Sequence, residues 1–325
     1  MREIIIQKND AGQRLDKFLS KALPGLPPSK LYKSIRTKKI KVNRKRAEAG
    51  QMLSEGDTLQ LFLAEDFFSD AEEGAESAAL SRITPSLDIL YEDENILLLN
   101  KRPGVSVHED ADGEGATLIL HVKAYLFAKG EYDPRDEQSF SPALCNRIDR
   151  NTGGIVIAAK NAESLRIMNE KIKKREIDKK YLCVVHGIPS PREATRIAFL
   201  KKDAGKNIVR IYDKSAPRDA KEIRTHYRVL KTSERYSLLE VTLLTGRTHQ
   251  IRAHMAHLGH PLLGDGKYGI NRADRGEGYK YQALWSYKLR FDFSEEQNAL
   301  SYLKGRTFTV PEEKIYFIKE FDHLR

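Results

Sequence analysis

The charge of the chain reverses sign between its N-terminal segment and the stretch that follows, and this segregation constrains how the chain divides into domains. Residues 1–62 hold fourteen Lys and Arg against six Asp and Glu, and residues 29–47 hold nine basic residues and no acidic one. Residues 64–82 hold six acidic residues and one arginine, and their Gly, Ala and Ser show no helical or strand period. We therefore expect a basic module over 1–63, an acidic flexible linker over 64–84 and a second domain over 85–325.

The basic module shows the patterns of short helices and strands. Apolar residues recur at helical spacing from Leu15 to Leu23. Ser29 stands where the N-cap of a second helix is expected, and Leu31 and Ile35 lie four residues apart in that helix. The pattern is completed by a strand over 40–42, a turn at 43–44 and alternating leucines at 59, 61 and 63.

The second helix would turn its basic side chains away from the apolar stripe, which suits a phosphate backbone. The basic side chains that we expect to contact RNA are Lys30, Lys33, Arg36, Lys38, Lys39, Lys41 and Arg44. Arg14–Leu19, followed by Lys39–Asn43, resembles the small RNA-binding module named after ribosomal small-subunit protein four, over about residues 12–63. A net charge of +10 for the whole chain also favours a polyanionic partner.

Composition excludes several classes of protein. Two cysteines cannot build a disulfide framework. The N-terminus returns to charged residues after three isoleucines, so we expect no signal peptide. No apolar stretch approaches the ~20 residues that a membrane-spanning helix needs. We therefore expect a cytoplasmic protein without a membrane partner.

Strand patterns outnumber helix patterns in the second domain. The clearest strand is 283–291, in which Ala, Trp, Tyr, Leu and Phe alternate onto one face. Helical stripes are present at 118–126 and 165–172. Further strands are expected at 87–91, 96–100, 155–159, 181–185, 223–231 and 236–244. Because tight turns join several of them, we expect an α+β fold: a small N-terminal α/β module and a domain built on a mainly antiparallel mixed sheet flanked by helices.

The first unusual motif runs from Cys145 to Gly154 and places Asp149 between Arg147 and Arg150. Taken alone, such an aspartate is more often a turn residue satisfied by neighbouring donors. The two arginines favour its charged form, however, and a charged carboxylate beside a Gly-Gly turn suits nucleophilic or electrostatic work.

The second motif runs from Leu244 to Pro261 and contains four histidines, which raises the possibility of a metal site. The motif has no acidic ligand and no HExxH spacing, and Arg247 and Arg252 would repel a divalent cation. We therefore expect no metal here, and packing, phosphate-contacting or turn roles for the histidines. Gly264–Gly269 fits the dinucleotide pattern GxGxxG, but it lacks a strand before and a helix after it, so we expect no cofactor there.

Together these segments resemble the RluA-class pseudouridine synthases over residues 87 to about 292. The segments that carry the resemblance are Leu98–Lys101 with Gly104 and His108, Asn146–Asp149, Lys180–Leu182 with Gly187, and Thr245–Arg252. Two positions depart from the family pattern: Asn146 replaces the usual His, and Arg102-Pro103 disturbs the Asn-Lys-Pro-x-Gly opening motif. Neither departure touches the residues expected to do the chemistry.

The resemblance implies an isomerase that detaches a uracil from its ribose, rotates it and rejoins it through carbon 5. Nothing is added or removed, so we expect no cofactor. Asp149 is then the catalytic carboxylate, which attacks sugar or base or takes a sugar proton. Arg252 pairs with it. Tyr181 lies against the target base, with its ring available for stacking and its hydroxyl for proton transfer at carbon 5.

The same resemblance implies that the uridine leaves its stack and that Arg147 fills the vacated position. Arg247 and His249 are expected at the RNA as well. The N-terminal module favours large-subunit ribosomal RNA as substrate, although the class also includes transfer RNA enzymes. A non-catalytic RNA-binding assembly factor and a histidine-based metallohydrolase are the alternatives from other classes. We expect a monomer without an obligate protein partner.

Overall fold

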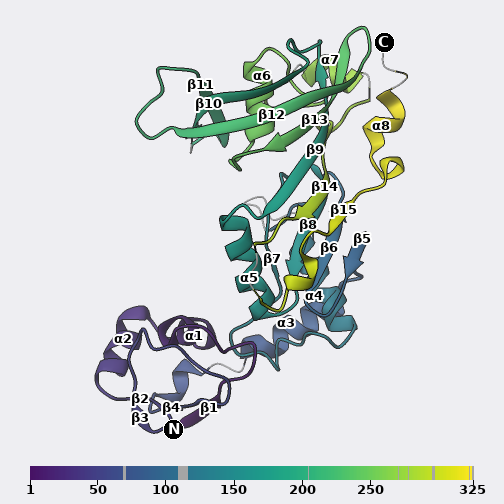
Figure 1. Ribbon diagram of the computed structural model, residues 1–325. Helices are drawn as coiled ribbons and strands as arrows, with labels where there is room; N and C mark the ends of the chain where they lie inside the picture. Colours follow the sequence, from purple (N-terminus) through teal and green to yellow (C-terminus); the bar gives the residue numbers. More distant parts are fainter. Residues whose placement is uncertain are drawn as a thin grey trace.

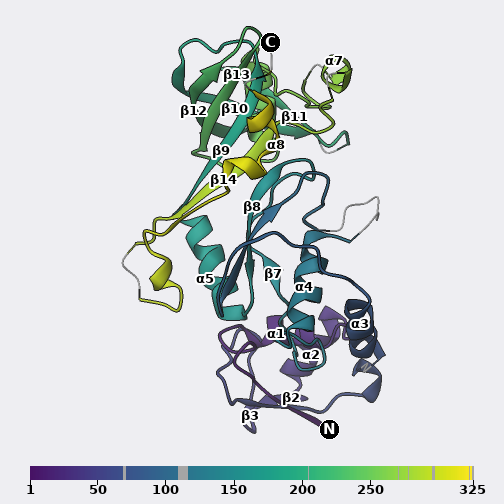
Figure 2. The same ribbon diagram turned by 90° about the vertical axis from the view of Figure 1, so that its right-hand side faces the viewer.

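The computed structural model describes residues 1–68, 71–108, 116–203, 205–269, 271–276, 278–294, 297–321 and 323. The molecule is elongated, with the N-terminal module at one end and the strands of residues 193–243 at the other (Figures 1 and 2). Among the described helices, none is long and apolar enough to cross a bilayer.

The N-terminal module packs two helices against a small antiparallel sheet. Its elements are β1 (Arg2–Ile5), α1 (Leu15–Ala22), α2 (Pro28–Arg36), β2 (Ile40–Val42), β3 (Lys45–Arg46) and β4 (Thr58–Leu61), with strand order β1-β4-β2-β3. Leu15, Phe18 and Leu19 are fully buried, so the helical spacing identified the core face correctly. The predicted turn is also present, because Asn43 and Arg44 both adopt positive φ between β2 and β3, as a two-residue hairpin requires.

The expected N-cap at Ser29 is wrong. Helix α2 begins at Pro28, with Pro27 before it and no side-chain cap. Proline is favoured at the first helical position because its φ is already helical and its missing N–H would have had no intrahelical partner.

The expectation of an irregular linker over 64–84 is also wrong for most of its length. A 3₁₀ turn, η1 (Glu65–Phe67), is followed by the helix α3 (Ala71–Ser81). This helix packs on the second domain, where Leu80 is buried and Ser77 donates a hydrogen bond to Asp133 at 3.1 Å. The alanines and glutamates of this segment have high helix propensity, and one buried leucine anchors them.

The second domain is organised around a single large sheet. Its strands are β5 (Ile89–Glu92), β6 (Ile96–Lys101), β7 (Ala143–Leu144), β8 (Gly153–Ala159), β9 (Ile177–His186), β10 (Glu193–Asp203), β11 (Ile208–Tyr212), β12 (Lys221–Thr232), β13 (Tyr236–Leu243), β14 (Leu284–Phe291) and β15 (Thr307–Thr309). The strand order is β11-β10-β12-β13-β9-β14-β8-β6-β5, and of these pairs only β14–β8 is parallel. The predicted mainly antiparallel mixed sheet is confirmed, whereas β10, β11 and the short β7 and β15 were not predicted.

Helices cover the sheet where β6 and β8 lie. These helices are α4 (Leu118–Ala128) and α5 (Ala162–Lys173). The remaining helical elements lie elsewhere in the domain: α6 (Gln250–His257), α7 (Asn271–Gly276), α8 (Tyr316–Phe321) and the 3₁₀ turns η2 (Ser301–Leu303) and η3 (Glu312–Lys314). Alternate residues of β6 and β8 pack with α4 on one face and with Met168 of α5 on the other. Burial on both faces explains why these strands are continuous apolar runs.

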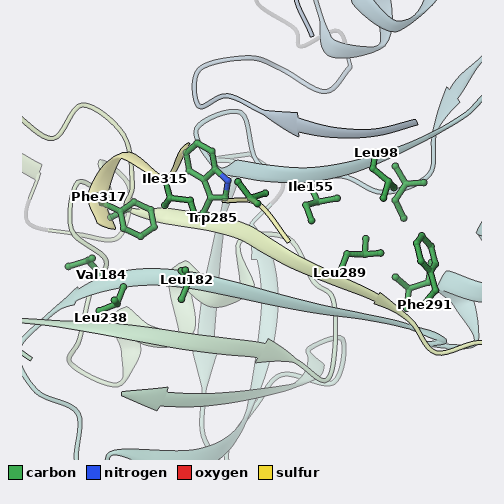
Figure 3. Packing of buried hydrophobic residues seen from close by; sticks show 14 of the residues in the cluster. Leu98, Ile155, Leu182, Val184, Leu238, Trp285, Leu289, Phe291, Ile315 and Phe317 are labelled. Atoms are coloured by element: carbon green, nitrogen blue, oxygen red, sulfur yellow. The ribbon is translucent and has the colours of Figure 1, made fainter. Parts of the chain in front are cut away.

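Strands β9 and β14 extend from this covered region into the β10–β13 region and hold the two together (Figure 1). Trp285, Leu289 and Phe291 of β14 lie on one face, as their alternation predicted, and pack with Leu182 of β9 and with Phe317 near the C-terminus (Figure 3). The register shifts once, between Ser286 and Lys288.

A polar interface joins the N-terminal module to the second domain. Its hydrogen bonds are Asn9 Nδ2 to Glu137 Oε1 (2.7 Å), Ala162 N to Asn9 Oδ1 (3.2 Å), Ser139 Oγ to Asp10 Oδ1 (2.6 Å), Gln13 Nε2 to Ser139 Oγ (2.7 Å), Gln138 Nε2 to Ile5 O (3.0 Å) and Arg166 Nη1 to Ala11 O (2.8 Å). The hydrophobic core of the module is separate from the cores of the second domain among the described residues.

Candidate active site

Asp149 lies in the loop between β7 and β8, and the side chain of Asn146 fixes the start of that loop. Asn146 Oδ1 accepts from the backbone N of Ile157 at 2.8 Å, and its Nδ2 donates to Ile155 O at 3.3 Å. The side chain thus bonds to strand β8 as a neighbouring backbone would. The asparagine that departs from the family pattern therefore has a structural role: it holds the loop that presents Asp149.

Two glycines bring this loop close to the centre of the sheet. A Cβ at Gly153 would lie 2.3 Å from an indole carbon of Trp285, and one at Gly154 would lie 2.2 Å from the carbonyl oxygen of Ser286. Gly154 also has a φ of +114°. Only glycine fits here, and because Ser286 pairs with Tyr181 on β9, the close approach brings the Asp149 loop toward Tyr181.

Arg252 of α6 joins Asp149 to a second carboxylate. Its Nη1 donates to Asp149 Oδ2 at 2.8 Å, while Nε and Nη2 donate to the two oxygens of Asp265 at 2.7 and 2.9 Å. Burial acts to lower the pKa of the Arg252 guanidinium, but the hydrogen bonds and charges of the two aspartates outweigh it and raise that pKa. The arginine therefore carries a permanent positive charge within the site.

Tyr181 of β9 is almost fully buried beside this ion pair. Burial raises the pKa of its phenol to about 12, and the negative charge of Asp149 acts in the same direction. Its hydroxyl is therefore protonated at neutral pH.

His249 lies at the start of α6, in a left-handed conformation with φ +53°. Its Nδ1 is 2.9 Å from the Tyr268 hydroxyl and its Nε2 is 3.9 Å from Asp149 Oδ2. Burial lowers the pKa of His249, and the charge of Asp149 opposes that effect. Arg247 and Arg147 are exposed. Arg147 is near His108, whose pKa is lowered by burial and then by the arginine's charge.

Residues 95–257 match the model of the RNA pseudouridylate synthase family, and residues 13–59 match that of the S4 domain. The ribosomal large subunit pseudouridine synthase C of Buchnera aphidicola subsp. Baizongia pistaciae is 34% identical over 272 residues, 83% of this chain and 81% of the relative. The chain belongs to the RNA pseudouridylate synthase family. The synthase is also 33% identical to the enzyme of the same name from Escherichia coli K12 over 300 residues, 89% of this chain and 88% of the relative.

Two solved structures share the fold of the synthase. Human RNA pseudouridylate synthase domain containing 4 superposes with a TM-score of 0.54 at 22% identity, covering 77% of this chain and 96% of the other. Human RNA pseudouridylate synthase domain containing 1 gives 0.53 at 20% identity, with coverage of 72% and 95%. Family membership makes this chain an RNA-binding isomerase that converts uridine to pseudouridine, and it favours neither a metallohydrolase nor a purely structural RNA-binding factor.

The histidines of the second motif have separate partners in the synthase. His254 Nδ1 lies 2.9 Å from the hydroxyl of Thr225, His257 Nε2 lies 3.0 Å from Asp213, and the Nδ1 of His260 lies 3.0 Å from a backbone oxygen. Within the described ranges, no group of three or more His, Cys, Asp or Glu side chains is placed to hold a metal ion.

Lys101 is a residue of the site whose role the sequence did not reveal. It is only 2% exposed, and its Nζ donates to the carbonyl oxygens of Arg102, Val105 and Arg150 at 2.8–3.0 Å. Burial lowers the pKa of its ammonium to about 7, and the charge of Asp149 opposes this. Lys101 thus joins the opening motif to the residue next to Asp149. The only sequence signal was its place in that motif.

Asp265 was also missed, because it belongs to the GxGxxG match that was set aside as a cofactor site. The structure gives this segment another role, since Asp265 is completely buried against Arg252.

The basic side chains of the S4 domain do not join this site. All except the half-buried Lys41 are exposed, and they lie on the N-terminal module, far from α6 (Figure 1). Two of them lie over aromatic rings: Lys41 over Phe62 and Lys30 over Phe67. The structure therefore brings Asp149, Arg252, Tyr181 and His249 together and keeps the S4 cations apart from them.

Proposed function

We propose that the synthase isomerises uridines of large-subunit ribosomal RNA. The observation that carries this proposal is the match, over more than four fifths of both chains, to relatives named ribosomal large subunit pseudouridine synthase C. An alignment of 300 residues necessarily includes parts of both the S4 domain and the catalytic domain of this chain.

In this proposal Asp149 is the reacting carboxylate. The bond between ribose C1′ and uracil N1 breaks, a bond between C1′ and C5 forms, a proton leaves C5 and a proton is gained at N1, so the composition of the RNA does not change. Asp149 supports such a step because its carboxylate is partly exposed and is held by Arg252. It attacks the sugar or the base, or removes a proton from the sugar.

Tyr181 supplies the surface against which the detached uracil rotates. A pKa of about 12 makes its phenol a poor general base at neutral pH, so we expect stacking by the ring to be its main contribution.

Arg147 occupies the space of the extruded uridine. It is exposed and lies two residues before Asp149, so it can reach the RNA where the base departs. Unstacking a base costs a few kcal/mol, and an arginine in the vacated position offsets part of that cost. His249 lies near Asp149, and Arg247 is exposed two residues before His249, so we assign both to contacts with the neighbouring nucleotides.

The S4 domain contributes affinity and orientation through phosphate contacts, which carry no sequence information by themselves. Its seven cations, from Lys30 to Arg44, suit a folded RNA whose backbone lies across α2 and the β2–β3 hairpin.

A pseudouridine map of ribosomal and transfer RNA, from cells with and without the gene, tests this proposal. We expect large-subunit sites to disappear and to return with wild-type protein but not with Asp149→Asn. Loss of transfer RNA sites instead would identify the rival substrate. A purified enzyme that isomerises no uridine in large-subunit RNA would contradict the proposal.

A further inference from the structure

We propose that Asp265 is a positioning residue. It binds the Nε and Nη2 atoms of the Arg252 guanidinium and leaves only Nη1 for Asp149, so that one oxygen of Asp149 stays free to react. The inference rests on the proposed roles of Asp149 and Arg252. It concerns a residue that contacts neither RNA nor the reacting atoms.

The division of the guanidinium is visible in its hydrogen bonds. Nε and Nη2 form the edge of an arginine that binds a carboxylate through two parallel hydrogen bonds, and Asp265 occupies that edge at 2.7 and 2.9 Å. Only Nη1 is directed at Asp149, at 2.8 Å from Oδ2. The other oxygen, Asp149 Oδ1, accepts no hydrogen bond from any described residue.

Without Asp265, the same edge of Arg252 would be free to close on Asp149. A bidentate arginine would then hold both carboxylate oxygens of Asp149, and a hydrogen bond would have to break before either could react. Asp265 prevents this bidentate pairing because its own two oxygens already accept from Nε and Nη2 of Arg252.

Asp265 also balances the charge of Arg252. The arginine side chain is 8% exposed, and a buried cation left without a counter-ion is strongly destabilising. Burial would raise the pKa of Asp265, but the hydrogen bonds and charge of Arg252, together with the backbone amides of Lys267 and Tyr268, hold it below its usual value. Arg252 therefore keeps a permanent partner even when Asp149 loses its charge during the reaction.

The turn that carries Asp265 is built for this placement. Asp265 Oδ1 accepts from the backbone N of Lys267 and of Tyr268 at 2.8 and 3.1 Å. A Cβ at Gly264 would lie 2.3 Å from the carbonyl oxygen of Tyr281, and one at Gly269 would lie 2.7 Å from that of Asp265. This turn accounts for Gly264 and Gly269, two of the three glycines of the GxGxxG match, without a nucleotide.

Asp265→Asn tests the inference, because it keeps the shape of the side chain and removes the charge. The matched control is Asp274→Asn, since Asp274 is equally buried and accepts from Gly264 N in the same turn at 2.8 Å without touching Arg252. Single-turnover rates on an RNA fragment that the wild type isomerises, RNA dissociation constants and thermal midpoints are measured for both variants.

We expect Asp265→Asn to lower the single-turnover rate by about tenfold to a hundredfold, the scale of a misplaced reacting group, with the dissociation constant within about threefold of wild type. Asp274→Asn should lower the thermal midpoint and keep the rate within about threefold. If Asp265→Asn does not fold, Asp265→Ser replaces it, because its hydroxyl still accepts from the turn amides, and the same loss is expected.

A double-mutant cycle separates positioning from general damage. In an Arg252→Lys background, Asp265→Asn should lower the single-turnover rate by less than about threefold. A lysine has no planar guanidinium whose N–H groups two carboxylates could share. Additive losses, or a wild-type rate for Asp265→Asn, would overturn the inference. The proposed function fails by a different result: no isomerisation by wild type, or a full rate for Asp149→Asn.

Discussion

The contribution of the S4 cations can be measured through the salt dependence of RNA binding. Lys33 and Arg36 both project from the exposed side of α2. Each cation that neutralises a phosphate releases counterions, and the slope of log K against log salt changes by about 0.7 to 0.9 per contact. Replacing both residues with Gln should therefore reduce the slope by about 1.4 to 1.8.

This change in slope predicts a specific pattern of affinities. The deficit of the double variant should be largest at low salt and should shrink by about sevenfold to twelvefold between 50 and 200 mM salt. Fluorescence anisotropy with a labelled large-subunit RNA fragment over this range measures it.

The matched control is Lys129→Gln with Arg135→Gln. Lys129 already pairs with Glu92 and Glu131, and Arg135 pairs with Asp133, so the charge of each is balanced by a neighbouring carboxylate. The control should keep the wild-type slope. An unchanged slope for the Lys33 and Arg36 variant would refute the reasoning, because it would mean that these cations contact no phosphate.

Four further outcomes are expected. Asp149→Asn should abolish turnover without weakening RNA binding, and a rate within about tenfold of wild type, roughly 1.4 kcal/mol of barrier, would exclude Asp149 as the reacting group. Arg147→Ala should slow isomerisation of a structured RNA more than that of a flexible single strand, and equal losses would contradict its role in base extrusion. The phenol of Tyr181 stays protonated through pH 6–10, so the ratio of wild-type to Tyr181→Phe single-turnover rates should be constant over that range; a ratio that changes tenfold per pH unit would show a titrating phenol. Gly154→Ala should lower stability by more than about 2 kcal/mol in denaturant unfolding, because its Cβ would meet backbone; a smaller loss would mean that β14 yields there.

Local periodicity was enough to predict the elements whose buried residues recur at helical or strand spacing along the chain. The helical spacing of Leu15, Phe18 and Leu19 and the alternation of Trp285, Leu289 and Phe291 both became core faces. Helix α3 was missed because Leu80 is the one buried hydrophobic residue among its described side chains, and a single apolar residue gives no periodic signal. Strands β10 and β11 are exposed or only partly buried over most of their length, and their residues show no strict alternation of apolar and polar side chains, so no strand signal was present in the sequence there.

The same distinction applies to the residues of the site: those within local motifs were predicted, and those that depend on contacts between separate segments were not. The motifs contained Asp149, Tyr181 and Arg252, and the fold brings all three together. The burial of Lys101 and the pairing of Asp265 with Arg252 depend on contacts between separate segments, and no spacing along the chain encodes such contacts. Confirming the roles of the three predicted residues belongs to the experiments above.

The polar interface between the S4 domain and the catalytic domain has a consequence for the reach of the enzyme. Each of its hydrogen bonds, such as Ser139 to Asp10 and Arg166 to Ala11, can be exchanged for one to water at little net cost. Interfaces without a shared apolar core permit relative motion of the domains they join. We therefore expect the distance between Asp149 and the phosphates proposed to contact the S4 domain to be adjustable. A synthase of this design would hold a single RNA helix and present uridines at more than one distance from it.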